Sequence, residues 1–184
     1  MYYSSSDYQN VDKMALRLRI DYGHFEKCLD VFKLAKQLNV NIIKYSSLTS
    51  EQLKTISGKE ELNDGFTIIR KQKRQQYKFY IFYNDSIGPA RIRFTIAHEI
   101  KHVAFLEENQ TEKDEDLANH FARYILAPTC LVMPYVGRFS VAELVSDFDI
   151  SYEAASNAYN AAENRILSSK SELTDYENEF IANL

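Results

Sequence analysis

Residues 94–102 read FTIAHEIKH and contain two of the chain's four histidines, His98 and His102, with Glu99 directly after the first. Residues four apart on an α-helix differ by about 40° in azimuth, so both imidazoles project from one face, one turn apart. Glu99 lies about 100° round from His98, where its carboxylate would stand beside a bound metal ion rather than on it. This H-E-x-x-H pattern predicts a metal-binding helix with a base next to the metal.

A third ligand is expected from the next predicted helix, residues 114–126, DEDLANHFARYIL. A catalytic zinc site takes three protein ligands and keeps one position for water, so two histidines are not enough. Glu115 and Asn119 are spaced i, i+4 and face one way. We expect the Glu115 carboxylate to complete the zinc coordination, and Asn119 to accept a hydrogen bond from a ligand imidazole. For His24 and His120 we favour structural roles.

The composition and the residue pattern favour an α+β fold that is mostly helical with a small antiparallel sheet. The 184 residues are 45% hydrophobic, which suits one domain with a buried core, and five glycines and three prolines leave few breaks. Aromatic and β-branched residues at 65–69 and 78–84 flank the polar stretch 70–76, as in a hairpin. Residues 40–45, VNIIKY, predict one more short strand.

Helical periodicity predicts helices on both sides of this sheet. They are expected near residues 7–18, 25–35, 49–57, 91–108, 114–126, 140–148, 151–167 and 171–184, the last loosely attached. We expect one domain, residues 1–184, in three parts. Residues 1–64 hold the N-terminal helices and first strand, residues 65–137 the hairpin with the two ligand helices, and residues 138–184 the C-terminal helices.

The charge and the cysteines predict a cytoplasmic protein that binds neither nucleic acid nor a membrane. The formal net charge is -4 at pH 7, so the overall field does not attract polyanions. The two cysteines lack close spacing, and residues 1–10, MYYSSSDYQN, lack the basic and apolar regions of a secretion signal. No stretch approaches the roughly 18 apolar residues of a membrane span.

Direct DNA binding is a separate hypothesis, because residues 140–160 have the rhythm of a helix-turn-helix unit. Its charge has the wrong sign, since residues 140–184 carry nine acidic and two basic side chains. The clearest positive cluster lies in the predicted hairpin and is interpreted as a solvated turn; it comprises Arg70, Lys71, Lys73, Arg74 and Lys78.

Two longer runs, RIRFTIAHEIKHVAFLE at 91–107 and EDLANHFARYILAP at 115–128, resemble the core signature of the ImmA/IrrE family of zinc metallo-endopeptidases. That signature is roughly R-F-T-x-A-H-E-x-x-H followed by E-x-x-A-N-x-F-A-x-x-[LI]-L-x-P. The resemblance implies a zincin-like metallopeptidase core. It also implies that His98, His102 and Glu115 bind zinc, and that Glu99 is the catalytic general base.

The resemblance also implies a regulatory role. Members of this family commonly cleave or otherwise inactivate a helix-turn-helix repressor, often one encoded on a phage or mobile element. We therefore expect a zinc-dependent endopeptidase with such a repressor as its protein substrate. The alternative is a zinc-stabilised, non-proteolytic protein that sequesters a transcriptional regulator.

Two further expectations concern the surroundings of the motif. Lys101 stands where the family usually has glycine, on the flank of the metal face, and its long stem is expected to reach solvent. An extended substrate is expected to pair with the edge of the strand at 77–84 through main-chain hydrogen bonds.

Overall fold

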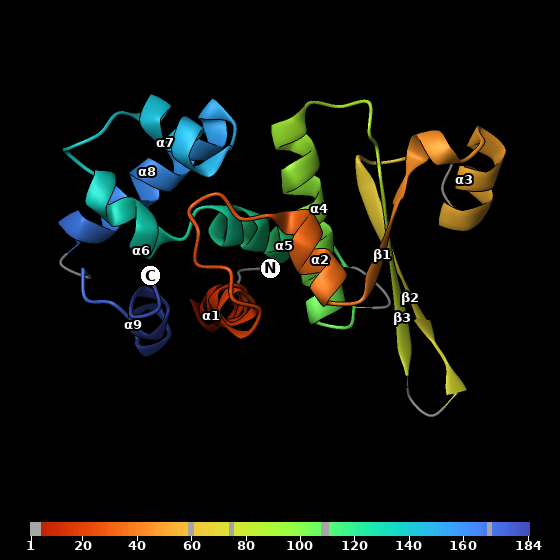
Figure 1. The fold of residues 1–184 in the computed structure, drawn as a ribbon, viewed down its shortest axis with the longest axis horizontal. Helices are drawn as coiled ribbons and strands as arrows, with labels where there is room; N and C mark the ends of the chain where they lie inside the picture. Colours follow the sequence, from red (N-terminus) through yellow and green to blue (C-terminus); the bar gives the residue numbers. More distant parts are fainter. Residues whose placement is uncertain (1–4, 59–60, 74–75, 108–110, 169–170) are drawn as a thin grey trace. The chain divides into compact units, whose positions relative to one another are not determined.

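The computed structural model describes residues 5–58, 61–73, 76–107, 111–168 and 171–184 (Figure 1). Its backbone packing groups the chain into two compact units. One unit is Val31–Ala118, and the other combines Met1–Asp30 with Asn119–Leu184. The predicted single domain in three consecutive parts is not tested by this grouping and stays a prediction.

Unit Val31–Ala118 is built on a three-stranded sheet in the order β1-β3-β2. Its strands are β1 (Val40–Lys44), β2 (Gly65–Lys71) and β3 (Tyr77–Tyr83). The β2–β3 hairpin is antiparallel, as predicted, but β1 runs parallel to β3, so the sheet is mixed. A residue pattern indicates a strand but not its direction. Here β3 lies between β1 and β2 and runs parallel to β1 and antiparallel to β2.

The central position of β3 removes it as a docking edge for a peptide. Both of its sides already bond to neighbouring strands, so the expectation that a substrate pairs with residues 77–84 is wrong. Among the described residues, β2 and β1 end the sheet. The main-chain groups on the outer sides of these two strands are the ones that could receive an added strand.

Three helices of this unit lie near the sheet. Helices α2 (Val31–Gln37) and α4 (Pro89–Ala104) pack against the strands. Helix α3 (Ser50–Ser57) lies beside one end of the strands, on the side away from α2 and α4 (Figure 1). The apolar side of α4 is fully buried at Ile96 and Ile100. Helix α5 (Glu112–Leu126) follows α4 along the chain. The α+β class predicted from the sequence is confirmed.

Short polar residues start several helices where the sequence predicts them. Thr49 caps α3 and exchanges hydrogen bonds with Gln52 in a capping box. In the other unit, Ser140 caps α7 (Val141–Phe148) and Ser151 caps α8 (Tyr152–Leu167). That unit also contains α1 (Ser5–Asp21), α6 (Thr129–Val132), the 3₁₀ turn η3 (Met133–Tyr135) and α9 (Asp175–Ile181). No described helix has the length and apolarity that a membrane span requires.

The predicted helix at 25–35 is wrong over its first half, because α2 begins only at Val31. Gly23, with φ of 69°, turns the chain out of α1. The Arg19 guanidinium, fully buried, then donates to the carbonyl oxygens of His24 and Glu26. These carbonyls are satisfied by a side chain rather than by helical N–H groups. A buried long-range donor therefore overrides the local periodicity.

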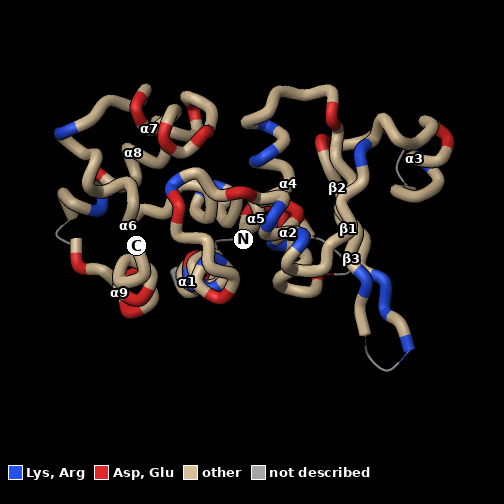
Figure 2. The backbone as a smooth tube through the Cα atoms, in the orientation of Figure 1, with Lys and Arg blue, Asp and Glu red and all other residues tan. Residues whose placement is uncertain are grey.

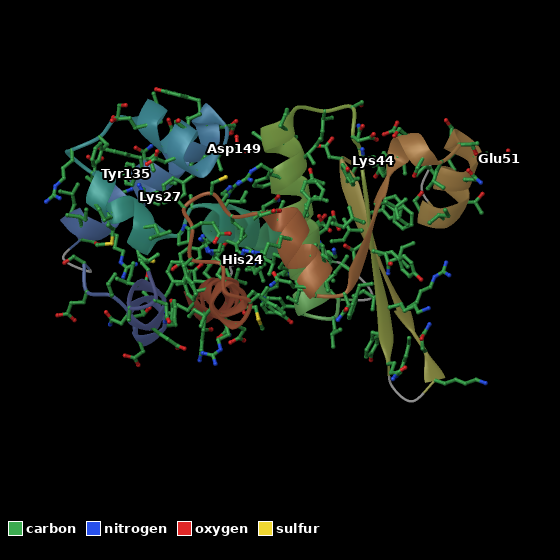
Figure 3. The ribbon with its side chains drawn as sticks, in the orientation of Figure 1. His24, Lys27, Lys44, Glu51, Tyr135 and Asp149 are labelled. Carbon is green, nitrogen blue, oxygen red and sulfur yellow. The ribbon has the colours of Figure 1, made fainter. Side chains whose placement is uncertain are left out.

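Side-chain contacts also tie the segment after α1 to the C-terminal helices. The Lys27 ammonium donates to the Tyr135 hydroxyl at 2.5 Å and to the Asp147 carboxylate at 2.9 Å (Figure 3). The basic residues of the hairpin, in contrast, are exposed along its free end (Figure 2); they are Arg70, Lys71, Lys73 and Lys78. Arg74 lies outside the described residues.

The sequence suggested that the last helix is loosely attached, but the structure shows that α9 is packed against the rest of its unit. Phe180 is fully buried, and the Glu177 side chain is 1% exposed. The Glu177 carboxylate accepts hydrogen bonds from Arg165 at 2.6 and 2.8 Å and from the Tyr124 hydroxyl at 3.1 Å. Burial by itself would raise the pKa of Glu177, but the bonds from Arg165 and Thr174 outweigh it and lower the pKa below its ordinary value.

Replacing Glu177 with glutamine is expected to destabilise the fold by roughly 1–3 kcal/mol at pH 7, because it removes the anionic partner of Arg165, whose side chain is 20% exposed. A lowered folded-state pKa adds stability above the unfolded value, and this stability is lost as pH falls through the folded pKa. Urea unfolding at neutral and acidic pH measures both effects. Glu179→Gln, on the exposed side of α9, is the control and should cost under about 1 kcal/mol. An equal cost at both pH values would contradict this account.

Candidate metal centre

Three side chains from α4 and α5 converge within unit Val31–Ala118. They are His98, His102 and Glu115, and their ligand atoms all lie within 4.8 Å of one another. Nε2 of His98 is 3.3 Å from Nε2 of His102 and 3.2 Å from Glu115 Oε2, and Glu115 Oε1 is 3.6 Å from His102 Nε2. Among the described residues, the structure thus brings together the three predicted ligands.

The spacing of these atoms fits a tetrahedral metal ion. Zinc binds imidazole nitrogen and carboxylate oxygen at about 2.0–2.2 Å, and tetrahedral angles then separate the ligand atoms by about 3.3–3.6 Å. The distances of 3.3 and 3.6 Å fall within that range, and the 3.2 Å distance lies just below it. The two distances to Glu115 involve its two different carboxylate oxygens. Two histidines and one carboxylate also leave a fourth position for water, the pattern of catalytic rather than structural zinc sites.

The hydrogen bonds of His102 orient it as a ligand. Its Nδ1 lies 2.7 Å from Glu107 Oε2, and a carboxylate oxygen can only accept, so Nδ1 carries the proton. In the neutral ring, Nε2 then presents a lone pair toward His98 and Glu115. The His102 side chain is 1% exposed, against 12% for His98 and 43% for Glu115. The cluster is therefore buried on its His102 side and reaches solvent on its Glu115 side.

A hydrogen bond from the sheet holds Glu99 in place. Its side chain is buried, and its Oε2 accepts a hydrogen bond from the Thr67 hydroxyl of β2 at 2.7 Å. Thr67 was not among the residues predicted from the sequence, because its contact with Glu99 spans 32 positions of the chain. The bond fixes one carboxylate oxygen of the residue next to His98. Such a fixed, buried carboxylate is suited to taking up a proton.

Lys101 does not reach solvent, and that expectation is wrong. Its side chain is 1% exposed, and its Nζ donates to the two oxygens of Glu107 at 2.5 and 2.6 Å. It also donates to the main-chain carbonyl of Asp114 at 3.1 Å. Burial of an ammonium is tolerated only with such a set of acceptors. Glu107 was missed in the sequence because the helix was predicted to run over 91–108, whereas α4 ends at Ala104 and the chain turns there.

A close approach between β2 and α4 sets the position of Glu99. A Cβ added to Gly65 would lie 2.5 Å from Thr95 Cγ2, 3.0 Å from the Phe82 carbonyl oxygen and 3.5 Å from Glu99 Cγ. The first distance is too short for two carbon atoms. The absence of a side chain at Gly65 therefore lets α4 pack directly against the sheet.

Gly65→Ser is expected to destabilise the protein by roughly 1–3 kcal/mol, since overpacking a filled core forces its neighbours apart. It should also lower activity by shifting α4 with Glu99. Gly88→Ser is the matched control, because a Cβ there meets nothing within 4 Å and serine suits the N-cap of α4. Thermal melting and cleavage rates of the two variants compare them. Equal melting temperatures and cleavage rates of the two variants would show that the close packing at Gly65 affects neither stability nor activity.

The remaining residues that the sequence analysis discussed are Asn119, His24 and His120. Asn119 lies one turn after Glu115 on α5, and its hydrogen bond to a ligand imidazole stays a prediction. His24 Nδ1 lies 2.8 Å from the Glu26 carboxylate, and His120 Nε2 lies 2.7 Å from Asp12. Both histidines belong to the unit of the terminal segments, and these contacts agree with the structural roles favoured for them.

The paired histidines, the adjoining carboxylate ligand and the buried Glu99 together define a candidate metallopeptidase centre. The family model for the IrrE N-terminal-like domain, Peptidase_M78, matches residues 50–160, more than half of the chain. The chain belongs to this peptidase family, and the resemblance noted in its sequence is confirmed. None of the curated proteins matches it at a significant level. Family membership makes the chain a metallopeptidase by class, and His98, His102 and Glu115 form its candidate metal site.

Proposed function

We propose that the chain is a zinc-dependent endopeptidase. The observation that carries this proposal is the convergence of one ligand atom each from His98, His102 and Glu115, all within 4.8 Å of one another. Zinc is favoured over calcium or magnesium because two of the three donors are imidazole nitrogens, whereas the harder cations take oxygen ligands. The two free cysteines, Cys28 and Cys130, agree with a reducing compartment, and we place the protein in the cytoplasm.

Each residue of the centre has a defined task in this proposal. His98, His102 and Glu115 hold the metal, which when bound supplies Lewis acidity that polarises the scissile carbonyl and acidifies a water. Glu99 takes the proton from the attacking water and later delivers it to the leaving amine. Thr67 keeps Glu99 Oε2 in place through its 2.7 Å hydrogen bond. Glu99 thus serves as base and then as acid from one fixed position.

An extended substrate segment is proposed to add to the outer edge of β2. This strand ends the described sheet and also carries Thr67, which contacts Glu99. Main-chain hydrogen bonds along a strand edge hold a peptide in register regardless of its side chains. The choice of substrate must then come from contacts away from the scissile bond.

The proposed substrate is a helix-turn-helix repressor of a phage or mobile element, a proposal that rests on the resemblance to the ImmA/IrrE family. We propose that no nucleic acid or membrane is involved, because the chain carries a net charge of -4. The alternative is sequestration of a transcriptional regulator without cleavage. The two candidates differ only in whether the bound partner is cut.

Capture with Glu99→Gln tests this proposal, since the variant should retain metal and substrate while turnover is blocked. The partner eluted from the variant is incubated with zinc-loaded wild type, and the products are identified by mass spectrometry. We expect a DNA-binding regulator and two fragments with one new terminus each. A captured regulator that stays intact with wild type would support sequestration instead.

A further inference from the structure

The end of α4 folds back on the metal centre. The N–H of Glu107 donates to the His102 carbonyl at 3.0 Å, and the N–H of Leu106 donates to the Val103 carbonyl at 3.2 Å. With Leu106 at φ of 53°, these bonds form a Schellman motif at the helix end. A left-handed conformation costs a non-glycine residue roughly 1–2 kcal/mol. The turn brings the Glu107 carboxylate onto the imidazole of His102.

A largely buried ion pair contacts the proposed ligand His102. Lys101 Nζ donates to both oxygens of Glu107, and Glu107 Oε2 is also 2.7 Å from His102 Nδ1. The same ammonium donates to the carbonyl of Asp114, the residue before Glu115. Lys101 thus contacts both chain segments that carry the proposed ligands. Its ammonium further lies 5.4 Å from the centre of the Phe105 ring.

Stability alone does not account for an ion pair at this position. Replacing a buried ion pair by neutral residues of similar volume is often without cost, because desolvation offsets the attraction between the charges. The arrangement does constrain the orientation of the His102 ring, because Lys101 anchors the Glu107 carboxylate and this carboxylate contacts His102 Nδ1. A residue that fixes the ring and tautomer of a metal-bound histidine typically changes metal affinity when it is altered.

We propose that Lys101 and Glu107 are positioning residues of the metal centre, which set the orientation of His102 for a divalent zinc ion. Lys101 acts through Glu107, and Glu107 holds the proton-bearing Nδ1 so that Nε2 faces the metal. The inference rests on the proposed zinc function and extends it to two residues outside the H-E-x-x-H pattern. It gives Lys101, where the family usually has glycine, a specific task in this chain.

Zinc affinity tests the inference without any substrate. The zinc-loaded full chain is titrated with a chromophoric chelator at one fixed pH, for wild type, Lys101→Met, Glu107→Gln and the double variant. Each single variant is expected to bind zinc about 10–100-fold more weakly. The double variant, which buries no unpaired charge, should lose less than the product of the two single losses, because the residues act in series. Lys36→Met and Glu112→Gln, exposed residues of the same unit, are the controls.

Each contrary outcome has a separate meaning. Substitutions at an uninvolved site are expected to change the zinc affinity by no more than about twofold. If the double variant binds zinc within that factor of wild type, the positioning role is overturned. The same holds if the variants only melt at lower temperature while their zinc affinity is unchanged, because such a pair would be merely structural. If wild type itself binds no zinc, the proposed metal function fails, and the inference fails with it.

Discussion

Replacing Glu99 with glutamine is expected to lower the rate of substrate cleavage by about 10²–10⁴-fold, the usual contribution of a general base. Glutamine has nearly the same shape, and its amide oxygen can still accept the Thr67 hydroxyl bond that Glu99 accepts at 2.7 Å. The basicity is lost, but the packing is kept. Zinc content and melting temperature should therefore stay near the wild-type values. Single-turnover cleavage of the captured substrate measures the loss.

Glu112→Gln provides the matched control for this prediction. Glu112 is an exposed glutamate in the first turn of α5, and it takes no part in the cluster. It undergoes the same chemical change as Glu99, so any general effect of removing a carboxylate from this region appears in both variants. Cleavage by Glu99→Gln at the rate of Glu112→Gln would rule out the assigned base.

The second large effect is expected for His98→Ala. Wild type should carry about one zinc per chain, and the variant should bind it more than about 100-fold more weakly, because altering a residue that merely orients a ligand already costs 10–100-fold. Removing the imidazole leaves only His102 and Glu115 to hold the ion. Metal analysis after dialysis, together with cleavage assays, records the loss.

His120→Ala is the corresponding control for the histidine substitution. His120 pairs with Asp12 at 2.7 Å and is not part of the cluster of ligand atoms. Its zinc content should match that of wild type. Unchanged zinc in His98→Ala would show that the metal is held elsewhere.

The parts of the centre that lie on one helix face could be predicted from the sequence. The i, i+4 spacing of His98 and His102 places their imidazoles together, and their Nε2 atoms are 3.3 Å apart in the structure. Glu115 comes from the following helix and was selected by the same periodicity. The pairing of His98 and His102 depends on helix geometry alone, whereas the approach of Glu115 also requires α5 to pack against α4.

Contacts that depend on the chain path between elements could not be predicted. Thr67 reaches Glu99 only because β2 packs on α4 at Gly65, and Glu107 reaches His102 only because Leu106 takes a left-handed conformation. Helical spacing placed Lys101 on the flank of the metal face, but it could not show that Glu107 would cover that flank. The parallel direction of β1 and the loop held by Arg19 could not be predicted either, because both depend on contacts between distant parts of the chain.

The central claim, cleavage of a repressor by this metal centre, is tested most directly by pairing repressor cleavage with reporter derepression in cells carrying wild type or Glu99→Gln. We predict that wild type cuts the repressor and relieves repression, and that Glu99→Gln does neither while still binding the repressor. Derepression by Glu99→Gln at the wild-type level, with the repressor left intact, would contradict the proteolytic account.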